Sequence, residues 1–371
     1  METKVKVEPK ERLQSLDTLR GFDMFWIIGG GAFITALSKA TDWGWLAPIA
    51  HQMHHTSWSG FQFEDLIFPL FMFISGVAIP FAITSKLEKG IEKKVLYKKV
   101  FIRMILLILL GFVYNGALRD GFSNMRYPSV LSQIGIAYFF AALIIINTTE
   151  IKTRIFWLVG ILAGIAAIQF LVPVPGFGAG AFTPDGSINA WLDQHILPGK
   201  LIYKTYDPEG VLCIVSATSV TLMGTFAGFI FRNKKINPNK KTVYLLIIGA
   251  AIVAAALLLS PVYPIIKKIW TVPFNMLTAG IGFLLIATFY YIIDVRKWDA
   301  WIFFFKVIGM NSITIYIGGR IIDFWHASGF LLGWLANPAG NFGDVIITVG
   351  VITLEWFFLY YLYKNKIFLR V

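Results

Sequence analysis

Two residues of this chain, His55 and Asp65, are of the types that transfer protons, and both stand where an apolar segment begins near residue 63. Ionisable groups at the edge of hydrocarbon are costly to desolvate, so in membrane helices they are rare and are functional by default. An acidic residue is also favourable in the first turn of any helix. The pair therefore has two interpretations: a reactive site, or a helix start without chemistry.

Three histidines, His51, His54 and His55, have the i, i+3, i+4 spacing that places side chains on one face of a helix. Such a cluster raises the question of a metal site. Residues 56–60, however, are typical of a loop or a helix cap, and no further set of ligands has a recognisable spacing. We expect no metal.

The elements around this pair are long and apolar. Hydrophobic residues make up 57% of the 371 residues and charged residues 15%, and the apolar positions gather into blocks of about 20 residues, the length that crosses a bilayer. This pattern predicts an all-α polytopic integral membrane protein with about ten transmembrane helices. The predicted spans are residues 18–38, 63–85, 100–117, 130–147, 154–172, 211–231, 243–261, 275–294, 302–323 and 343–363.

Lysine and arginine are unevenly divided between the two sides of these spans. An even number of spans puts both termini on one side, and that side collects most of the basic residues, which predicts that it is cytoplasmic. His55 then faces the external side. The net charge of +12 reflects this asymmetry, and basic loops of this kind suit anionic lipid, so nucleic-acid binding is not expected. The basic residues on the cytoplasmic side are Lys4, Lys6, Lys10, Arg12, those within 86–103, Lys152, Arg154, those within 232–241, Arg296, Lys297, Lys364, Lys366 and Arg370.

A single transmembrane domain, residues 18–371, is expected to follow a charged cytoplasmic leader, residues 1–17, which lacks the apolar core of a signal peptide. The longest external loop covers about residues 173–210, with one short helix near residues 188–196. External loops of this length are more often lids or binding elements than simple connectors. The single cysteine, Cys213, excludes an intrachain disulfide.

Carboxylates and aromatic rings gather on this external face. Asp207 and Glu209 end the long loop, and Trp58 and Trp191 belong to the same side. Flat rings stack on the apolar face of a sugar and carboxylates accept hydrogen bonds from its hydroxyl groups, so these four residues would suit a carbohydrate. Interfacial tryptophans are also ordinary membrane anchors, and both interpretations stay open.

Several short motifs carry a resemblance across nearly the whole chain. They are residues 12–21 (RLQSLDTLRG), 29–31 (GGG), 55–60 (HTSWSG) with 65–69 (DLIFP), 127–135 (YPSVLSQIG), 207–210 (DPEG), 270–280 and 309–312 (GMNS). In this order they resemble the heparan-α-glucosaminide N-acetyltransferase family and its bacterial relatives. The LDTLRG opening is also similar to the wider transmembrane acyltransferase superfamily.

The resemblance implies an acetyltransferase that works across a membrane. Acetyl-CoA approaches from the cytoplasm, and the acetyl group passes to the amine of a terminal glucosamine on the opposite side. The family's histidine falls on His55 and its aspartate on Asp65, whereas Ile27 stands where the family has an asparagine. Lysosomal members carry an extra luminal domain and one more span, so we expect a free-standing bacterial type in the cytoplasmic membrane. Relatives also suggest a homodimer.

This reaction explains why a histidine and an aspartate are needed together. An amine that attacks a thioester must lose a proton, and an imidazole can accept it near neutral pH. His55 is the expected general base, and Asp65 would hold the other ring nitrogen and stabilise the imidazolium, as carboxylates do in hydrolytic triads. A covalent acetyl-histidine relay is the alternative mechanism.

The phosphates of CoA require cations or helix N-termini on the cytoplasmic side. Arg20 and Arg103 are the candidates, although each side chain is also long enough to snorkel to the lipid headgroups. Gly30 lies in a glycine run that interrupts the first span and allows close approach of a pantetheine arm or of another helix. Asn311 carries a buried amide that must find a partner on a helix or on the donor.

Two other classes of protein remain as alternatives. A transporter of amino sugars or short glycans would also have about ten spans, a broken helix and polar residues within the membrane. No inverted repeat of the His55 motif is visible in the second half of the chain. A membrane scaffold without chemistry would leave the pairing of His55 with Asp65 unexplained.

Overall fold

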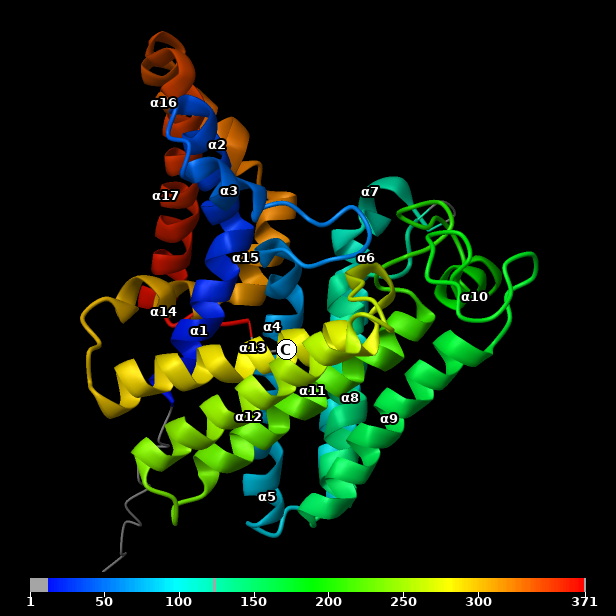
Figure 1. Cartoon of the computed structure of the whole chain (residues 1–371). Helices are drawn as coiled ribbons and strands as arrows, with labels where there is room; N and C mark the ends of the chain where they lie inside the picture. The colour runs from blue at the N-terminus through cyan, green and yellow to red at the C-terminus, as the bar shows by residue number, and fades with distance from the viewer. Residues whose placement is uncertain (1–12, 123–124, 370–371) are drawn as a thin grey trace, which may run out of the picture.

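The protein is described here by a computed structural model that covers residues 13–122 and 125–369, and the regular elements in these ranges are helices. Figure 1 shows long helices that pack side by side along most of the molecule. In chain order the elements are α1 (Gln14–Phe25), η1 (Trp26–Gly30), α2 (Gly31–Ala40), α3 (Leu46–His51), α4 (Phe63–Ile79), η2 (Pro80–Thr84), α5 (Ser85–Leu87), α6 (Lys93–Tyr114), α7 (Ala117–Asp120), α8 (Val130–Asn147), α9 (Ile151–Leu171), α10 (Ile188–Ile196), α11 (Val211–Arg232), α12 (Pro238–Leu259), η3 (Lys267–Ile269), α13 (Val272–Phe289), η4 (Tyr290–Val295), α14 (Ile302–Met310), α15 (Ser312–Ile321), α16 (Phe324–Ala336), η5 (Asn337–Phe342) and α17 (Gly343–Lys364).

Within the described ranges, eight helical segments are long and apolar enough to cross a membrane, or nine if the bent pair α14 and α15 forms one span. This confirms the prediction of an all-α polytopic membrane protein. The remaining predicted span, residues 100–117, lies mostly in α6. That helix is 22 residues long but begins with a basic stretch that lowers its mean hydropathy. Its basic residues are Lys93, Lys94, Lys98, Lys99 and Arg103.

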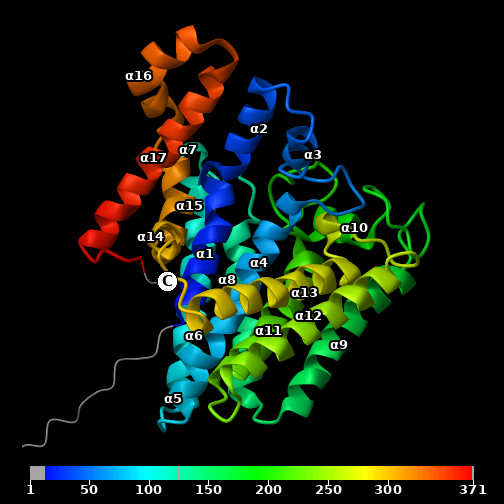
Figure 2. The same ribbon diagram turned by 60° about the vertical axis from the view of Figure 1, so that its left-hand side comes forward.

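The two ends of the bundle differ in their loops. In both Figure 1 and Figure 2, α5 lies at one end, whereas α3, α7 and α16 lie toward the other. The basic stretch of residues 86–103 begins in α5, and His55 follows α3 in the chain. These two features are thus separated along the bundle, as the predicted orientation requires. Which end faces the cytoplasm stays a prediction.

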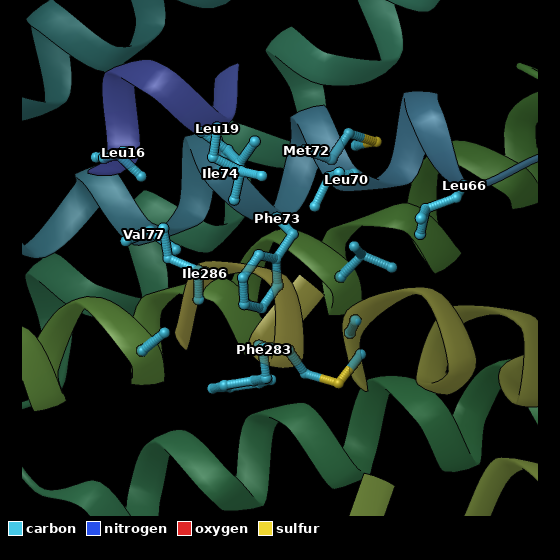
Figure 3. Packing of buried hydrophobic residues seen from close by; sticks show 14 of the residues in the cluster. Leu16, Leu19, Leu66, Leu70, Met72, Phe73, Ile74, Val77, Phe283 and Ile286 are labelled. Carbon is cyan, nitrogen blue, oxygen red and sulfur yellow. The ribbon is translucent and has the colours of Figure 1, made fainter. Parts of the chain in front are cut away.

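The core forms where α4 packs against α11 and α13. Phe73 and Phe283 meet with ring centroids 4.9 Å apart at an interplanar angle of 66°, and Figure 3 shows them among aliphatic side chains of α4. Both rings are buried. Close helix contact is possible because Gly76 of α4 faces Gly224 of α11, so the two backbones touch without intervening side chains.

Two features of the helices depart from a regular bundle. The glycine run interrupts the first span as predicted: Gly29 has φ 145°, which only glycine adopts without strain, inside the π-helical turn η1. Residues 324–342, which the predicted spans treat as a connection, instead form α16 and η5. The error arises because this segment is apolar but too short to be counted as a separate span.

Candidate active site

The start of α4 places Asp65 against His55. Asp65 Oδ2 accepts hydrogen bonds from the backbone N–H groups of Gln62 (3.1 Å) and Thr56 (3.3 Å) and from the Thr56 hydroxyl (3.2 Å). The bond from Gln62 completes a capping box at the first turn of α4. The other oxygen, Oδ1, lies 2.9 Å from His55 Nδ1. The helix-start interpretation is therefore confirmed, and it is compatible with the pairing of Asp65 and His55 because the cap and the pair use different carboxylate oxygens. That the pair is reactive stays a prediction.

The environments of the two partners are unequal. The Asp65 side chain is 1% exposed, whereas that of His55 is 49% exposed. A buried carboxylate with four hydrogen-bond partners is a fixed acceptor, and it favours the tautomer in which His55 Nδ1 carries the proton. In that tautomer Nε2 holds a free lone pair on the accessible side chain, which is what a general base or a nucleophile requires.

Lys267 completes this cluster from a distant part of the sequence. Its Nζ lies 3.1 Å from His55 Nδ1 and 3.4 Å from Asp65 Oδ1. Burial lowers the pKa of Lys267 below its ordinary value, and the negative charges of Asp65 and Glu209 partly offset this effect. One nitrogen cannot donate to Asp65 and accept from Lys267 at once. The contact with the anionic oxygen is the shorter one, which indicates that Nδ1 carries the proton and donates a hydrogen bond to Asp65.

The loop that carries Lys267 is fastened to the loop that carries His55. Lys268 Nζ donates to the carbonyl of Ser57 at 2.5 Å, and the N–H of Gly60 donates to the carbonyl of Ile265 at 2.9 Å. Trp270 follows directly in the left-handed region, with φ 47°, and its side chain is fully buried. A bulky residue adopts this conformation only where its surroundings enforce it, so the position of Lys267 is fixed by packing.

These residues open onto a cavity of about 270 Å³, termed here the His55 cavity. Its walls are mainly apolar and come from α1, α4, α8 and α15, whereas its polar groups are His55, Glu64, Glu209, Lys267 and Tyr316. A narrow apolar space with ionisable groups in its wall suits the arm of an acyl carrier whose reactive end meets a base. The residues that line it are Met24, Ile27, His55, Glu64, Ile67, Phe68, Phe71, Val130, Leu131, Ile134, Glu209, Lys267, Ile313 and Tyr316.

Arg126 holds the two carboxylates at the end of the long loop. Its Nε donates to Asp207 Oδ2 at 2.7 Å, its Nη2 donates to Asp207 Oδ1 at 2.5 Å, and it also pairs with Glu209. Burial opposes the charge of Arg126, but Asp207 and Glu209 outweigh it and raise the pKa of Arg126 above its ordinary value. Burial raises the pKa of Glu209, although Arg126 counteracts it. Asp207 is fully buried, so of the two predicted carboxylates only Glu209 reaches the His55 cavity.

Both predicted tryptophans make their contacts with residues of the long loop. Trp58 Nε1 donates to the carbonyl of Phe182 at 2.7 Å, and its ring meets Tyr206 edge-on at 5.2 Å. Trp191 lies in α10, as predicted for a short helix there, and stacks on His195 at 4.3 Å. Neither tryptophan is among the residues that line the His55 cavity. Their role in acceptor binding stays a prediction.

The predicted donor-side residues are spread over several places. Arg103 lines a separate cavity of about 320 Å³ with Lys99, and its guanidinium lies 3.9 Å from the centre of the Tyr138 ring. Arg20 forms an ion pair with Asp17 at 3.5 Å. Asn311, which is buried at the bend between α14 and α15, donates to the carbonyl of Ile367 at 3.0 Å.

Gly30, the remaining donor-side candidate, is the last residue of η1 and packs against the end of α1. A Cβ at this position would lie 2.7 Å from the Phe25 ring. Tight packing thus explains the absence of a side chain there, and an additional contact with the donor stays a prediction. Among the described residues, no three His, Cys, Asp or Glu side chains are placed to hold a metal ion. His51 Nδ1 instead accepts a hydrogen bond from the Gln62 side-chain amide N–H at 3.0 Å.

Sequence reasoning missed Lys267 and Glu64 as site residues. Both signals were present but weak. The pair Lys267–Lys268 is a local excess of cations on the side predicted to be external, where cations are few, and Glu64 directly precedes Asp65. Lys267 has no sequence neighbour that points to chemistry.

Together these features define a polytopic, all-α membrane protein whose bundle holds a cavity lined by His55 and Lys267, with Asp65 paired to the histidine behind it. Residues 12–203, just over half of the chain, match the family described as "Domain of unknown function (DUF5009)", and the chain belongs to that family.

The chain is also similar to "Heparan-alpha-glucosaminide N-acetyltransferase" of Homo sapiens and of Mus musculus. Each is 25% identical to it over 97% of this chain. The chain spans 60% of the length of these curated relatives. These matches confirm the resemblance that the sequence motifs indicated.

Proposed function

We propose that this protein is a transmembrane N-acetyltransferase that moves acetyl from cytoplasmic acetyl-CoA to the amine of a glucosamine-type sugar on the external side. One observation carries the proposal: His55 Nδ1 lies 2.9 Å from a fully buried Asp65, and the same histidine lines an apolar cavity within the bundle. This is the geometry of an oriented base beside a space for an acyl carrier. The similarity to the named N-acetyltransferases supports it.

The residues divide the reaction in a simple way. The amine nitrogen attacks the thioester carbon, and His55 Nε2 accepts the proton that the amine loses. Asp65 accepts the hydrogen bond from Nδ1–H and stabilises the imidazolium. When the carbon–sulfur bond breaks, the CoA sulfur leaves as a thiolate and takes the proton from His55. In the relay alternative Nε2 attacks first, and the amine then receives acetyl from the histidine.

Lys267 supplies the positive charge that this pathway needs. A tetrahedral intermediate at the thioester carbon bears an oxyanion, and a cation in the cavity wall stabilises it. Lys267 is therefore assigned as the cation beside His55 that stabilises this oxyanion.

We expect Lys267→Met to lower kcat/KM by about tenfold, the scale of one lost charge interaction. Lys267→Arg keeps the charge and should retain most of the activity. Lys200→Met, which removes an exposed cation from the long loop, serves as the matched control. A kcat/KM of Lys267→Met equal to that of wild type would contradict the assignment.

The donor and acceptor sides rest on separate residues. We assign Arg103, with Lys99, to the CoA phosphates because both line one cavity on α6, and Arg20, Gly30 and Asn311 remain candidates for the same side. On the acceptor side, Glu209 lines the His55 cavity and Asp207 secures Arg126. We place the protein in the bacterial cytoplasmic membrane and expect a homodimer that needs no metal.

The decisive experiment supplies purified protein with labelled acetyl-CoA and glucosamine and measures labelled N-acetylglucosamine. A rival transporter is favoured by one observation, the 71° bend between α14 and α15, because broken helices are common at transport sites. Sealed vesicles that accumulate glucosamine without acetyl-CoA, together with no product from the purified protein, would establish the transporter instead.

A further inference from the structure

A second cavity adjoins the first. It has a volume of about 540 Å³ and lies between α2, the turn at residues 53–54 and the hairpin of α16 and α17. We term it the α2–α17 cavity. Ile27 and Glu64 line both this cavity and the His55 cavity, so these two side chains form a shared wall between them. A molecule in the second cavity would meet the reactive histidine by passing Glu64.

The two cavities differ in chemistry. Beyond its reactive end, the His55 cavity is walled by residues such as Ile67, Phe68 and Phe71. The α2–α17 cavity has small and apolar residues in its wall too, but it adds hydroxyl, charged and indole groups: Thr35, Lys39, Asp344, Thr348, Trp26 and Trp325. The Trp26 indole N–H is buried and has no hydrogen-bond partner among the described residues. Such a lining suits a hydrated ligand that accepts hydrogen bonds and offers a face for stacking.

Glu64 is built to face this ligand. Its backbone N–H donates to the carbonyl of Gln52 at 3.0 Å, which fixes the first turn of α4. Asp65, the next residue, turns to His55, whereas Glu64 lies in the wall of both cavities. Across the described ranges, no hydrogen bond or ion pair is found for the Glu64 carboxylate. A half-buried carboxylate whose oxygens make no hydrogen bond, between a polar space and a base, is suited to a cationic group that can donate one.

We propose that the α2–α17 cavity binds the acceptor as a protonated amino sugar, and that Glu64 holds the ammonium at the entrance to the His55 cavity. This inference rests on the proposed acetyl transfer and deepens it. Glu64 forms a charge-assisted hydrogen bond to the ammonium and keeps its own charge throughout. The ammonium first releases one proton to solvent, which leaves a neutral amine with a lone pair. That amine attacks the thioester carbon, and the second proton that it loses passes to His55 Nε2 and then to the departing CoA thiolate. Glu64 is thus a specificity determinant, and it distinguishes an amino sugar from a neutral one.

The test is a binding measurement that needs no turnover. The full-length protein in detergent is titrated with glucosamine and with glucose, and acetyl-CoA binding is measured separately. We expect wild type to bind glucosamine about tenfold more tightly than glucose, the scale of one charge-assisted hydrogen bond. Glu64→Gln, which keeps the shape and removes the charge, should abolish that preference and leave acetyl-CoA binding unchanged. Glu92→Gln, the same change at the exposed N-terminus of α6, should retain the preference.

Trp325→Ala provides a second variant, since Trp325 lines the α2–α17 cavity and is 50% exposed. It should weaken the binding of both sugars and leave acetyl-CoA binding unchanged. If Glu64→Gln and Trp325→Ala both bind glucosamine as wild type does while the protein still forms N-acetylglucosamine, the inference is overturned and the proposed function stands. If glucosamine binding depends on Glu64 but no acetyl transfer occurs, the cationic-sugar site stands and the proposed function fails.

Discussion

His55→Ala is expected to lower kcat/KM for N-acetylglucosamine formation by at least about a hundredfold, the usual scale for removal of a general base. The reason is geometric. His55 is the accessible member of the cluster, at 49% exposure, and Asp65 is 1% exposed, so Asp65 itself cannot reach an amine in the His55 cavity. The measurement is the initial rate of labelled product at several glucosamine concentrations.

Two further variants make this result specific. Asp65→Asn should lose less activity than His55→Ala, because an amide oxygen still accepts the Nδ1 proton but no longer carries the charge that stabilises the imidazolium. His326→Ala removes an exposed imidazole from α16 and should behave as wild type. Equal rates for His55→Ala and wild type would refute the assignment of the base, whatever the other two variants do.

The His55–Asp65 contact was predictable because it is local. Ten residues separate the two partners, and the same carboxylate that pairs with the histidine also caps the helix that follows. A helix start can be recognised in a sequence from its acidic first turn and the apolar run that follows it. Both the capping of the helix and the expected pairing with His55 therefore pointed to Asp65.

Lys267 was beyond the reach of such reasoning because its contact is long-range. It meets His55 across a separation of 212 residues, and nothing in the local sequence of η3 indicates which loop will lie opposite. The contact depends on packing, including the left-handed backbone at Trp270 and the hydrogen bond from Lys268 to Ser57. Glu64 was missed for a different reason: its proposed role depends on the two cavities that it lines, and cavities cannot be inferred from a sequence.

The helices themselves were largely predictable from hydropathy, since a bilayer requires long apolar segments whatever their packing. The departures have physical causes. The first half of α6 is basic, which lowers its hydropathy without preventing a helix. The bend at Asn311 divides one apolar run into α14 and α15, and α16 is too short to be recognised as a span.

Gly76→Ala is expected to destabilise the protein by about 1–3 kcal/mol or more, the cost of forcing extra atoms into a packed interior. A Cβ on Gly76 would collide with the carbonyl oxygen of Thr221 and lie 2.9 Å from its carbonyl carbon. Because the obstacle is backbone rather than a flexible side chain, α4 and α11 would have to move apart. Gly224 and Gly228 on α11 face the α4 backbone in the same way, which is the small-residue spacing of closely packed membrane helices.

The matched control is Gly164→Ala in α9, where a Cβ would meet no heavy atom within 4 Å. It makes the same chemical change in a transmembrane helix and should leave heat tolerance unchanged or slightly raised, since alanine favours a helix over glycine. The measurement is the fraction of protein that remains monodisperse in detergent after heating. Gly76→Ala should aggregate at a temperature several degrees lower than wild type, and equal heat tolerance would contradict the assigned backbone contact. Because α4 also carries Glu64 and Asp65, the surviving fraction of Gly76→Ala should lose acetyl transfer in parallel, whereas that of Gly164→Ala should not.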